Sequence, residues 1–163
     1  MAAIADERPT QPFPPNGVQL VFDFANQDVL FSIKPNYADK ILDGRKTVEL
    51  RRRFTNSEVT GSLAFIYSTS PVRELVGYAR IRDVRRLSVG DIWREYRDAA
   101  GIDKANFDSY FEGTREGYVI VLDEPTRLAD GVPIADLRER FGFVPPQSFR
   151  YVPREYHSLI GSA

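Results

Sequence analysis

The spacing of short strand-like segments most limits what this chain can fold into. Runs rich in β-branched and aromatic residues are separated by turn residues, and helix-like periodicity interrupts them at only a few places. The strand-like segments are Val29–Ile33, Lys46–Arg52, Leu63–Tyr67, Glu74–Val84, Tyr118–Leu122 and Ser148–Val152. Because the chain lacks the regular strand–helix alternation of a doubly wound sheet, it predicts an α+β fold: a small β-barrel of five to six mostly antiparallel strands with flanking helices.

Helix signals lie between these strands. Asn36 can cap a short helix that stops at Gly44, and apolar side chains recur there at i and i+4. Ser88 begins a second helix, with an aspartate three residues later in a capping-box arrangement. Asp103 can cap a third helix, and Pro133 opens a last short one. The predicted order is therefore strand, helix, three strands, helices, strand, short helix and strand.

The length of 163 residues fits one domain with its own hydrophobic core. Residues 1–28 carry several prolines and no hydrophobic periodicity, so we expect a proline-rich, partly extended arm. Within this arm, residues 18–24 could form either a short strand or a clasp on the domain surface. Residues 29–155 are expected to form the folded domain, and residues 156–163 a C-terminal tail.

Composition excludes several kinds of site. The chain has no cysteine, which rules out disulfides, thiolate zinc sites, iron–sulfur clusters and a cysteine nucleophile. His157 is the only histidine, and no group of carboxylates has the spacing of a metal site, so no cofactor or metal is expected. The net charge of −1 excludes a wholly basic nucleic-acid binder but leaves room for a local basic face.

The N-terminal residues lack a basic segment followed by an apolar one, so they do not predict a secretory signal. No apolar run is long enough to span a bilayer, and no membrane partner is expected. These features favour a cytoplasmic location.

The segment Gly44–Arg51 holds the most informative charge pattern. If it forms a strand, Glu49, Arg51 and Arg53 point to one side and Lys46 lies at the mouth. Cations around one carboxylate could clamp a phosphate while Glu49 accepts from a base amino group. The same residues could instead be a solvated strand face with ordinary ion pairs, each contributing about 0–1 kcal/mol. Spacing by itself leaves both interpretations open.

A family resemblance favours the first interpretation. Gly44, Lys46, Glu49 and Arg51 match the G-x-K-x-x-E-x-R motif of ASCH domains, which belong to the PUA-like superfamily. Other stretches of the chain also resemble this family, from its opening strand and helix to its closing segment. These stretches are Ser32–Ile41, Ile66–Pro71, Val76–Gly77 and Pro145–Tyr151. The resemblance spans about residues 29–152, so residues 29–155 are assigned to an ASCH domain.

The resemblance implies a small β-barrel with a polar cleft between barrel and helices, and RNA or a modified nucleotide as the partner. The residues it places in the cleft are Lys34, Lys46, Glu49, Arg51 and Ser68. Tyr67 could stack on a base or pack inside the barrel. Arg53 could contact phosphate or end a solvated strand.

Three functional hypotheses follow. The first is a module that binds RNA or a nucleotide, with phosphates held by Lys34, Lys46 and Arg51 and a base edge read by Glu49 and Ser68. The second is a hydrolase resembling a ribonuclease or an N4-acetylcytidine amidohydrolase, with Lys46 and Glu49 as catalytic residues. In the amidohydrolases the nucleophilic threonine falls on Glu49 of this chain. The third is a regulatory domain that contacts an unidentified protein through the proline-rich arm.

Overall fold

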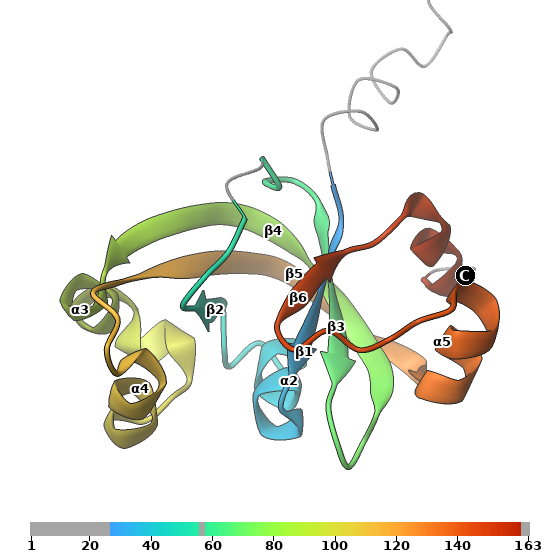
Figure 1. Ribbon diagram of the computed structural model, residues 1–163, viewed down its shortest axis with the longest axis horizontal. Helices are drawn as coiled ribbons and strands as arrows, with labels where there is room; N and C mark the ends of the chain where they lie inside the picture. The colour runs from blue at the N-terminus through green and yellow to red at the C-terminus, as the bar shows by residue number, and fades with distance from the viewer. Residues whose placement is uncertain (1–26, 56–57, 161–163) are drawn as a thin grey trace, which may run out of the picture.

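A six-stranded sheet runs through the part of the chain that the computed structural model describes, residues 27–55 and 58–160 (Figure 1). Its strand order is β2-β5-β4-β3-β1-β6, and the neighbouring strands are antiparallel except for the parallel pair β1 and β3. The strands are β1 (Val29–Ile33), β2 (Val48–Arg51), β3 (Leu63–Ser68), β4 (Glu74–Ser88), β5 (Glu116–Pro133) and β6 (Phe149–Tyr151). The predicted α+β class and strand number are confirmed. The predicted arm up to residue 26, including its possible strand at 18–24, lies outside the described residues.

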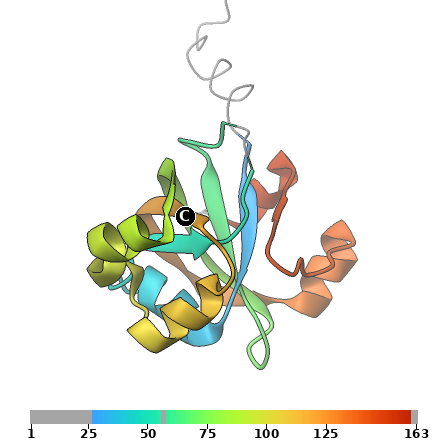
Figure 2. The same ribbon diagram turned by 60° about the vertical axis from the view of Figure 1, so that its left-hand side comes forward.

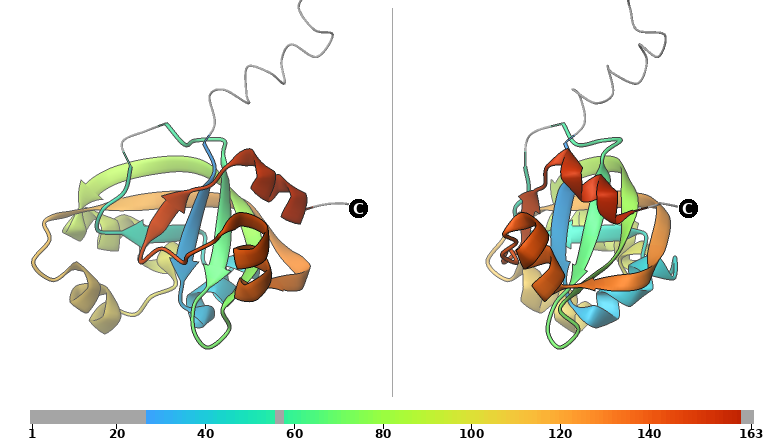
Figure 3. Two further views of the ribbon diagram at one scale, coloured as in Figure 1. Left: turned by 45° about the vertical axis from the view of Figure 1, so that its right-hand side comes forward. Right: turned by 90° about the vertical axis from the view of Figure 1, so that its right-hand side faces the viewer.

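The two long strands β4 and β5 give the sheet its curvature. Their pairing shifts register at three places, Leu75/Gly77, Tyr78/Arg80 and Ile81/Asp83. Such irregularities bend a strand and increase its right-handed twist. The sheet therefore curls into a half-barrel, as the end-on view in the right panel of Figure 3 shows.

The helices gather at the two ends of the curled sheet and beneath its centre. They are α2 (Pro35–Leu42), α3 (Val89–Ala100), α4 (Lys104–Phe111) and α5 (Ile134–Phe141), followed by a 3-10 helix, η1 (Arg154–Leu159). Figures 1 and 2 show α3 and α4 together at one end, α5 at the other, and α2 between them. The predicted order of strands and helices is confirmed. In the described part of the chain, no helix is both long and apolar enough to cross a bilayer.

Capping side chains explain where α3 and α4 begin. The Ser88 hydroxyl accepts from the Asp91 amide at 3.2 Å, and Asp103 accepts from the Asn106 amide at 2.8 Å, as predicted. The prediction of Asn36 as a cap is wrong, because α2 already begins at Pro35. Proline suits the first helical position, since its fixed φ is helical and its missing N–H would have no partner there.

Gly44 lies in the turn directly after α2 with φ of +79°, a conformation that glycine adopts without strain. Gly77 of β4 has a different role near the same, C-terminal end of this helix. A Cβ atom at Gly77 would lie 2.5 Å from both a Leu42 methyl and the Thr126 carbonyl. Glycine is therefore required where α2 packs closely on β4.

Three hydrophobic clusters form the core along the length of the sheet. The first lies under α2 and contains Phe31 and Ile66; the second lies under α5 and contains Phe65 and Tyr156. The third packs α3 and α4 against β2 and β5 and contains Phe107. This third cluster fixes the position of α4 next to β2, which positions one wall of the functional site.

The described part of the predicted C-terminal tail, residues 156–160, packs on the domain. Tyr156 of η1 is only 1% exposed and stacks on Phe141 with ring centroids 4.3 Å apart. Its ring also meets Phe65 edge-on. Tyr156 is therefore part of the hydrophobic core, and Leu159 and Ile160 pack against it.

Candidate functional site

A polar pocket of about 540 Å³ lies between β2 and the helices α2 and α4. This cavity is referred to below as the polar pocket. Its lining combines charged, hydroxyl and aromatic side chains from elements far apart in sequence. Its principal polar residues are Ser32, Lys34, Tyr37, Lys46, Glu49, Arg51, Thr69, Asn106, Ser109, Tyr110 and Gln147.

Strand β2 divides its side chains between the core and this pocket. Val48 and Leu50 join the hydrophobic cluster under α3 and α4, and Leu50 also borders the pocket; the charged Glu49 and Arg51 line the pocket. This is the alternation that the strand pattern predicts. Both charged residues are 8% exposed, so the pocket floor holds charges that are mostly removed from water.

Arg51 braces the pocket floor. Its Nη2 atom lies 3.2 Å from Glu49 Oε1 and donates to the Ser32 carbonyl at 3.1 Å. Its Nη1 atom donates to Ser148 Oγ at 3.1 Å, and the guanidinium carbon lies 5.2 Å from the centre of the Phe31 ring. Arg51 thereby joins β1, β2 and the loop before β6, and it holds Glu49 in one orientation.

Lys46 is a deeply buried lysine of the pocket, and its pKa is lowered. It is 5% exposed, and its Nζ atom donates to the Ala100 carbonyl at 2.6 Å. Glu49 Oε2 lies 3.7 Å away, beyond hydrogen-bond distance, and has no hydrogen-bond partner among the described residues. Burial lowers the pKa of Lys46, and the charges of Arg51 and Lys40 lower it further, against the opposing effect of Glu49. Lys46 is therefore easier to deprotonate than an exposed lysine.

Two tyrosines face the same space. Burial raises the pKa of Tyr37, and the carboxylates of Asp103 and Glu49 raise it further. Burial also raises the pKa of Tyr110. Both phenols therefore remain protonated at neutral pH and can donate hydrogen bonds. Lys46 Nζ lies 5.4 Å from the centre of the Tyr37 ring, which places an amine and a phenol at one end of the pocket.

The structure brings four of the sequence-predicted site residues together: Lys34, Lys46, Glu49 and Arg51 all line the polar pocket. Ser68 is buried in β3 and does not line it; its neighbour Thr69 does. Tyr67 packs in the core against Phe143, with ring centroids 5.2 Å apart. Arg53 is exposed and lies outside the pocket.

Sequence reasoning missed Tyr37, Ser148 and the contribution of α4. In the sequence, Tyr37 contributes only to the apolar i, i+4 pattern of the helix that stops at Gly44. Asn106 and Tyr110 lie more than fifty residues from the motif, so no local pattern could join them to it. Among residues 27–55 and 58–160, no group of three or more histidine, cysteine, aspartate or glutamate residues is placed to hold a metal ion.

Comparison with known proteins places this site in a family. The model of the ASCH domain matches residues 31–126, more than half of the chain. An ASCH domain-containing ribonuclease of Zymomonas mobilis is 29% identical over 130 residues, which cover 79% of this chain and 86% of that protein. The large ribosomal subunit protein uL22 of Ureaplasma parvum is 24% identical over 127 residues, but these cover only 39% of its length.

Solved structures agree with this result. The crystal structure of ASCH from Zymomonas mobilis superposes with a TM-score of 0.76 at 28% identity, covering 81% of this chain and 92% of that one. The N-terminal domain of Staphylothermus marinus McrB shares the fold alone, with a TM-score of 0.53 at 13% identity, covering 82% of this chain and 92% of that one. The match of the family model, together with the motif at the floor of the polar pocket, shows that this chain belongs to the ASCH domain family.

Proposed function

We propose that the polar pocket binds one nucleotide of an RNA strand and cleaves the strand beside it. The observation that carries this proposal is the buried Lys46, whose pKa is lowered and which lies beside a protonated phenol, Tyr37. The pocket volume lies within the range of about 300–1,000 Å³ that is typical of small-molecule sites. The name of the Zymomonas mobilis relative, a ribonuclease, supports the same substrate class.

The pocket residues suit an internal phosphoryl transfer. In this reaction the ribose 2′-oxygen attacks the adjacent phosphorus, its proton leaves, and the bond from phosphorus to the 5′-oxygen breaks. The products are a 2′,3′-cyclic phosphate and a free 5′-hydroxyl. An uncharged Lys46 would accept the 2′-hydroxyl proton, and Tyr37 would donate a proton to the departing 5′-oxygen.

The other polar residues would bind and orient the substrate. Lys34 is exposed at the pocket mouth, where its ammonium group can contact a phosphate. Asn106 and Gln147 offer amide groups to a base edge. Glu49 and Arg51 would keep Lys46 in place, because their ion pair forms the floor beneath it.

The test is cleavage of a short single-stranded RNA by the wild type, Lys46→Met and Tyr37→Phe, with products identified by mass spectrometry. Lys104→Met is the matched control, since Lys104 is an exposed lysine outside the pocket. We expect a 2′,3′-cyclic phosphate from the wild type and the control. Loss of a general acid or base costs about 10²–10⁴-fold in rate, so both pocket variants should fall by that factor.

A 2′-deoxy substitution at the cleaved position removes the nucleophile and should prevent cleavage. RNA that the wild type binds but leaves intact would contradict the catalytic role and leave an RNA-binding module. Product from Lys46→Met at the wild-type rate would contradict the assignment of Lys46.

A further inference from the structure

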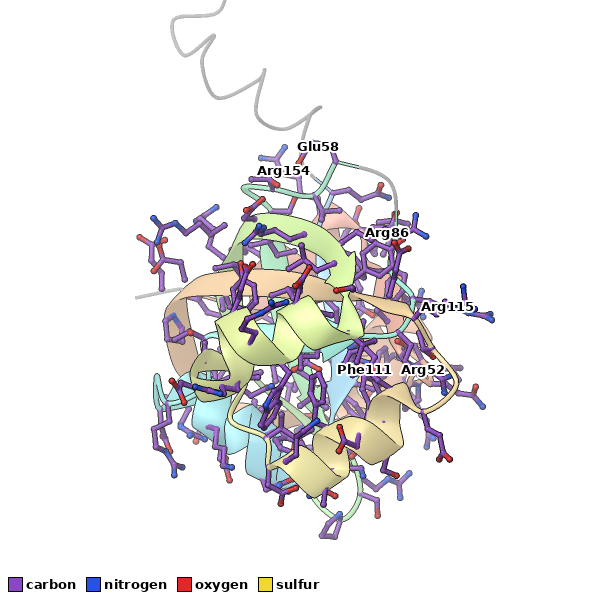
Figure 4. All side chains as sticks on the ribbon, turned by 90° about the vertical axis from the view of Figure 1, so that its left-hand side faces the viewer. Arg52, Glu58, Arg86, Phe111, Arg115 and Arg154 are labelled. Carbon is purple, nitrogen blue, oxygen red and sulfur yellow. The ribbon has the colours of Figure 1, made fainter. Side chains whose placement is uncertain are left out.

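A second polar surface, the arginine groove, lies just past the end of β2. It is an open hollow of about 600 Å³. Its charged residues are Arg52, Arg53, Arg86, Arg115 and Glu116. The groove therefore carries a charge of +3, although the whole chain has a net charge of −1. Figure 4 shows Arg52, Arg86 and Arg115 along one side of the molecule.

The four arginines fall into two pairs. Arg52 and Arg86 have protein partners: Arg52 Nε donates to Thr114 Oγ1 at 3.0 Å, and Arg86 lies 2.9 Å from Glu116. Arg53 and Arg115 are exposed, and within the described residues their side chains form no hydrogen bond or ion pair. Two guanidinium groups thus remain available to a ligand, beside two that the protein holds in place.

The groove adjoins the polar pocket through neighbouring residues. Arg51 lines the pocket, and the next two residues along the chain line the groove. Tyr110, which also lines the pocket, accepts a hydrogen bond from the Arg52 amide at 3.1 Å and donates to the Leu50 carbonyl at 3.3 Å. An RNA strand that leaves the polar pocket past Tyr110 would therefore meet the arginine groove next.

We propose that the arginine groove is a second subsite, which binds the phosphodiester backbone of the RNA strand flanking the nucleotide in the polar pocket. This inference rests on the proposed function, because it assumes that the strand occupies the pocket. A guanidinium presents parallel N–H donors that match two phosphate oxygens. Contacts to phosphate carry no base preference. The groove would therefore raise the affinity for longer RNA strands without favouring any base sequence.

The test compares ligands that do and do not reach the groove. The long probe is a 2′-fluoro RNA octamer, which lacks the 2′-hydroxyl nucleophile, and the short probe is the corresponding dinucleotide. Binding of each is measured over a series of salt concentrations for the wild type and Arg53→Ala/Arg115→Ala. The matched control is Arg82→Ala/Arg138→Ala, which removes the same charge from exposed arginines that line neither the pocket nor the groove.

We expect the groove variant to bind the octamer about tenfold more weakly at low salt, since two phosphate contacts are lost. The slope of log affinity against log salt should become shallower by about 1.4, or about 0.7 for each lost contact with a single strand. Dinucleotide binding should not change, and the control should keep the wild-type slope. Equal weakening in the groove and control variants, or an unchanged slope, would overturn the subsite.

A second readout separates this inference from the proposed function. Cleavage of an RNA dinucleotide depends on the polar pocket and not on the groove. Normal dinucleotide cleavage with octamer binding insensitive to the groove variant would overturn the subsite and leave the proposed function intact. Groove-dependent octamer binding without cleavage of any RNA would uphold the phosphate surface and overturn the catalytic proposal.

Discussion

The polar pocket and the arginine groove take arginines from consecutive positions of the chain but hold their charges in opposite ways. Arg51 is buried and bonded on several sides by Glu49, Ser32 and Ser148. Arg53, two residues later, is exposed and has no ion pair within the described residues. Buried charges that lose a partner destabilise the fold strongly, whereas exposed ones contribute little. The pocket should therefore tolerate substitution poorly, and the groove should tolerate it well.

The sharpest form of this contrast compares two glutamates that each pair with arginine. Glu49→Ala leaves Lys46 and Arg51 buried without a counter-charge, and we expect the free energy of unfolding to fall by about 3 kcal/mol. Glu116→Ala removes the partner of the exposed Arg86, and the expected loss is at most about 1 kcal/mol. Urea denaturation of both variants measures the difference. Equal losses of unfolding free energy in the two variants would mean that the pocket charges are as well solvated as the exposed ones.

The pH dependence of stability tests the burial of Lys46. Its pKa in the folded protein lies below the value of 10.5 expected in the unfolded chain. Between these two values the unfolded state binds more protons, so the free energy of unfolding rises with pH. Relative to Lys46→Met, the wild type should therefore gain stability as the pH is raised toward 10.5. Urea denaturation of both proteins from pH 7 to 10 checks this, and a constant difference would contradict it.

A smaller effect is expected at the boundary between the two regions. Tyr110→Phe removes the hydroxyl that accepts from the Arg52 amide and donates to the Leu50 carbonyl. Loss of one such hydrogen bond costs about 1 kcal/mol of stability. Tyr78→Phe is the control, because the Tyr78 hydroxyl forms no hydrogen bond within the described residues. In thermal unfolding, the melting temperature of Tyr110→Phe should fall, whereas that of Tyr78→Phe should match the wild type.

The smallest effect on stability is expected in the groove itself. Arg53→Ala should change the free energy of unfolding by no more than about 0.5 kcal/mol, as is usual for exposed side chains. Its melting temperature should match that of the wild type while its affinity for the RNA octamer falls. A large loss of stability would show that Arg53 has a structural contact, and it would remove the contrast with Arg51.

Much of the fold follows from local patterns. The alternation in β2 predicted which side chains face the core, and Ser88 and Asp103 predicted two helix starts through hydrogen bonds within three residues. The predicted start of α2 was wrong by two residues: the cap was assigned to Asn36, whereas the N-cap is Lys34 and Pro35 occupies the first helical position. The capping preference of asparagine and the preference of proline for the first helical position compete there, and the backbone of the folded protein follows the second.

The candidate site, like the fold, could be predicted from the sequence only in part. The motif spacing placed Lys46, Glu49 and Arg51 together because two of them alternate on one strand and the third precedes it. Burial of these charges could not be read from spacing, since it depends on Tyr37 and on α4, which closes over them from distant sequence. Ser68 and Tyr67 were predicted in the site because their side chains suit a nucleotide. The folded sheet buries both of them, so they do not line the pocket.

Local sequence was thus sufficient for the order of strands and helices and for the charged motif at the pocket floor, because both depend on interactions between residues close in the chain. Tertiary structure decided which charges are buried and which are exposed. It also decided that Lys46 meets the carbonyl of Ala100, fifty-four residues away, and that its pKa falls. The physical reason is desolvation: the state of a charge depends on everything packed around it, and in this protein most of that surrounding comes from distant parts of the chain.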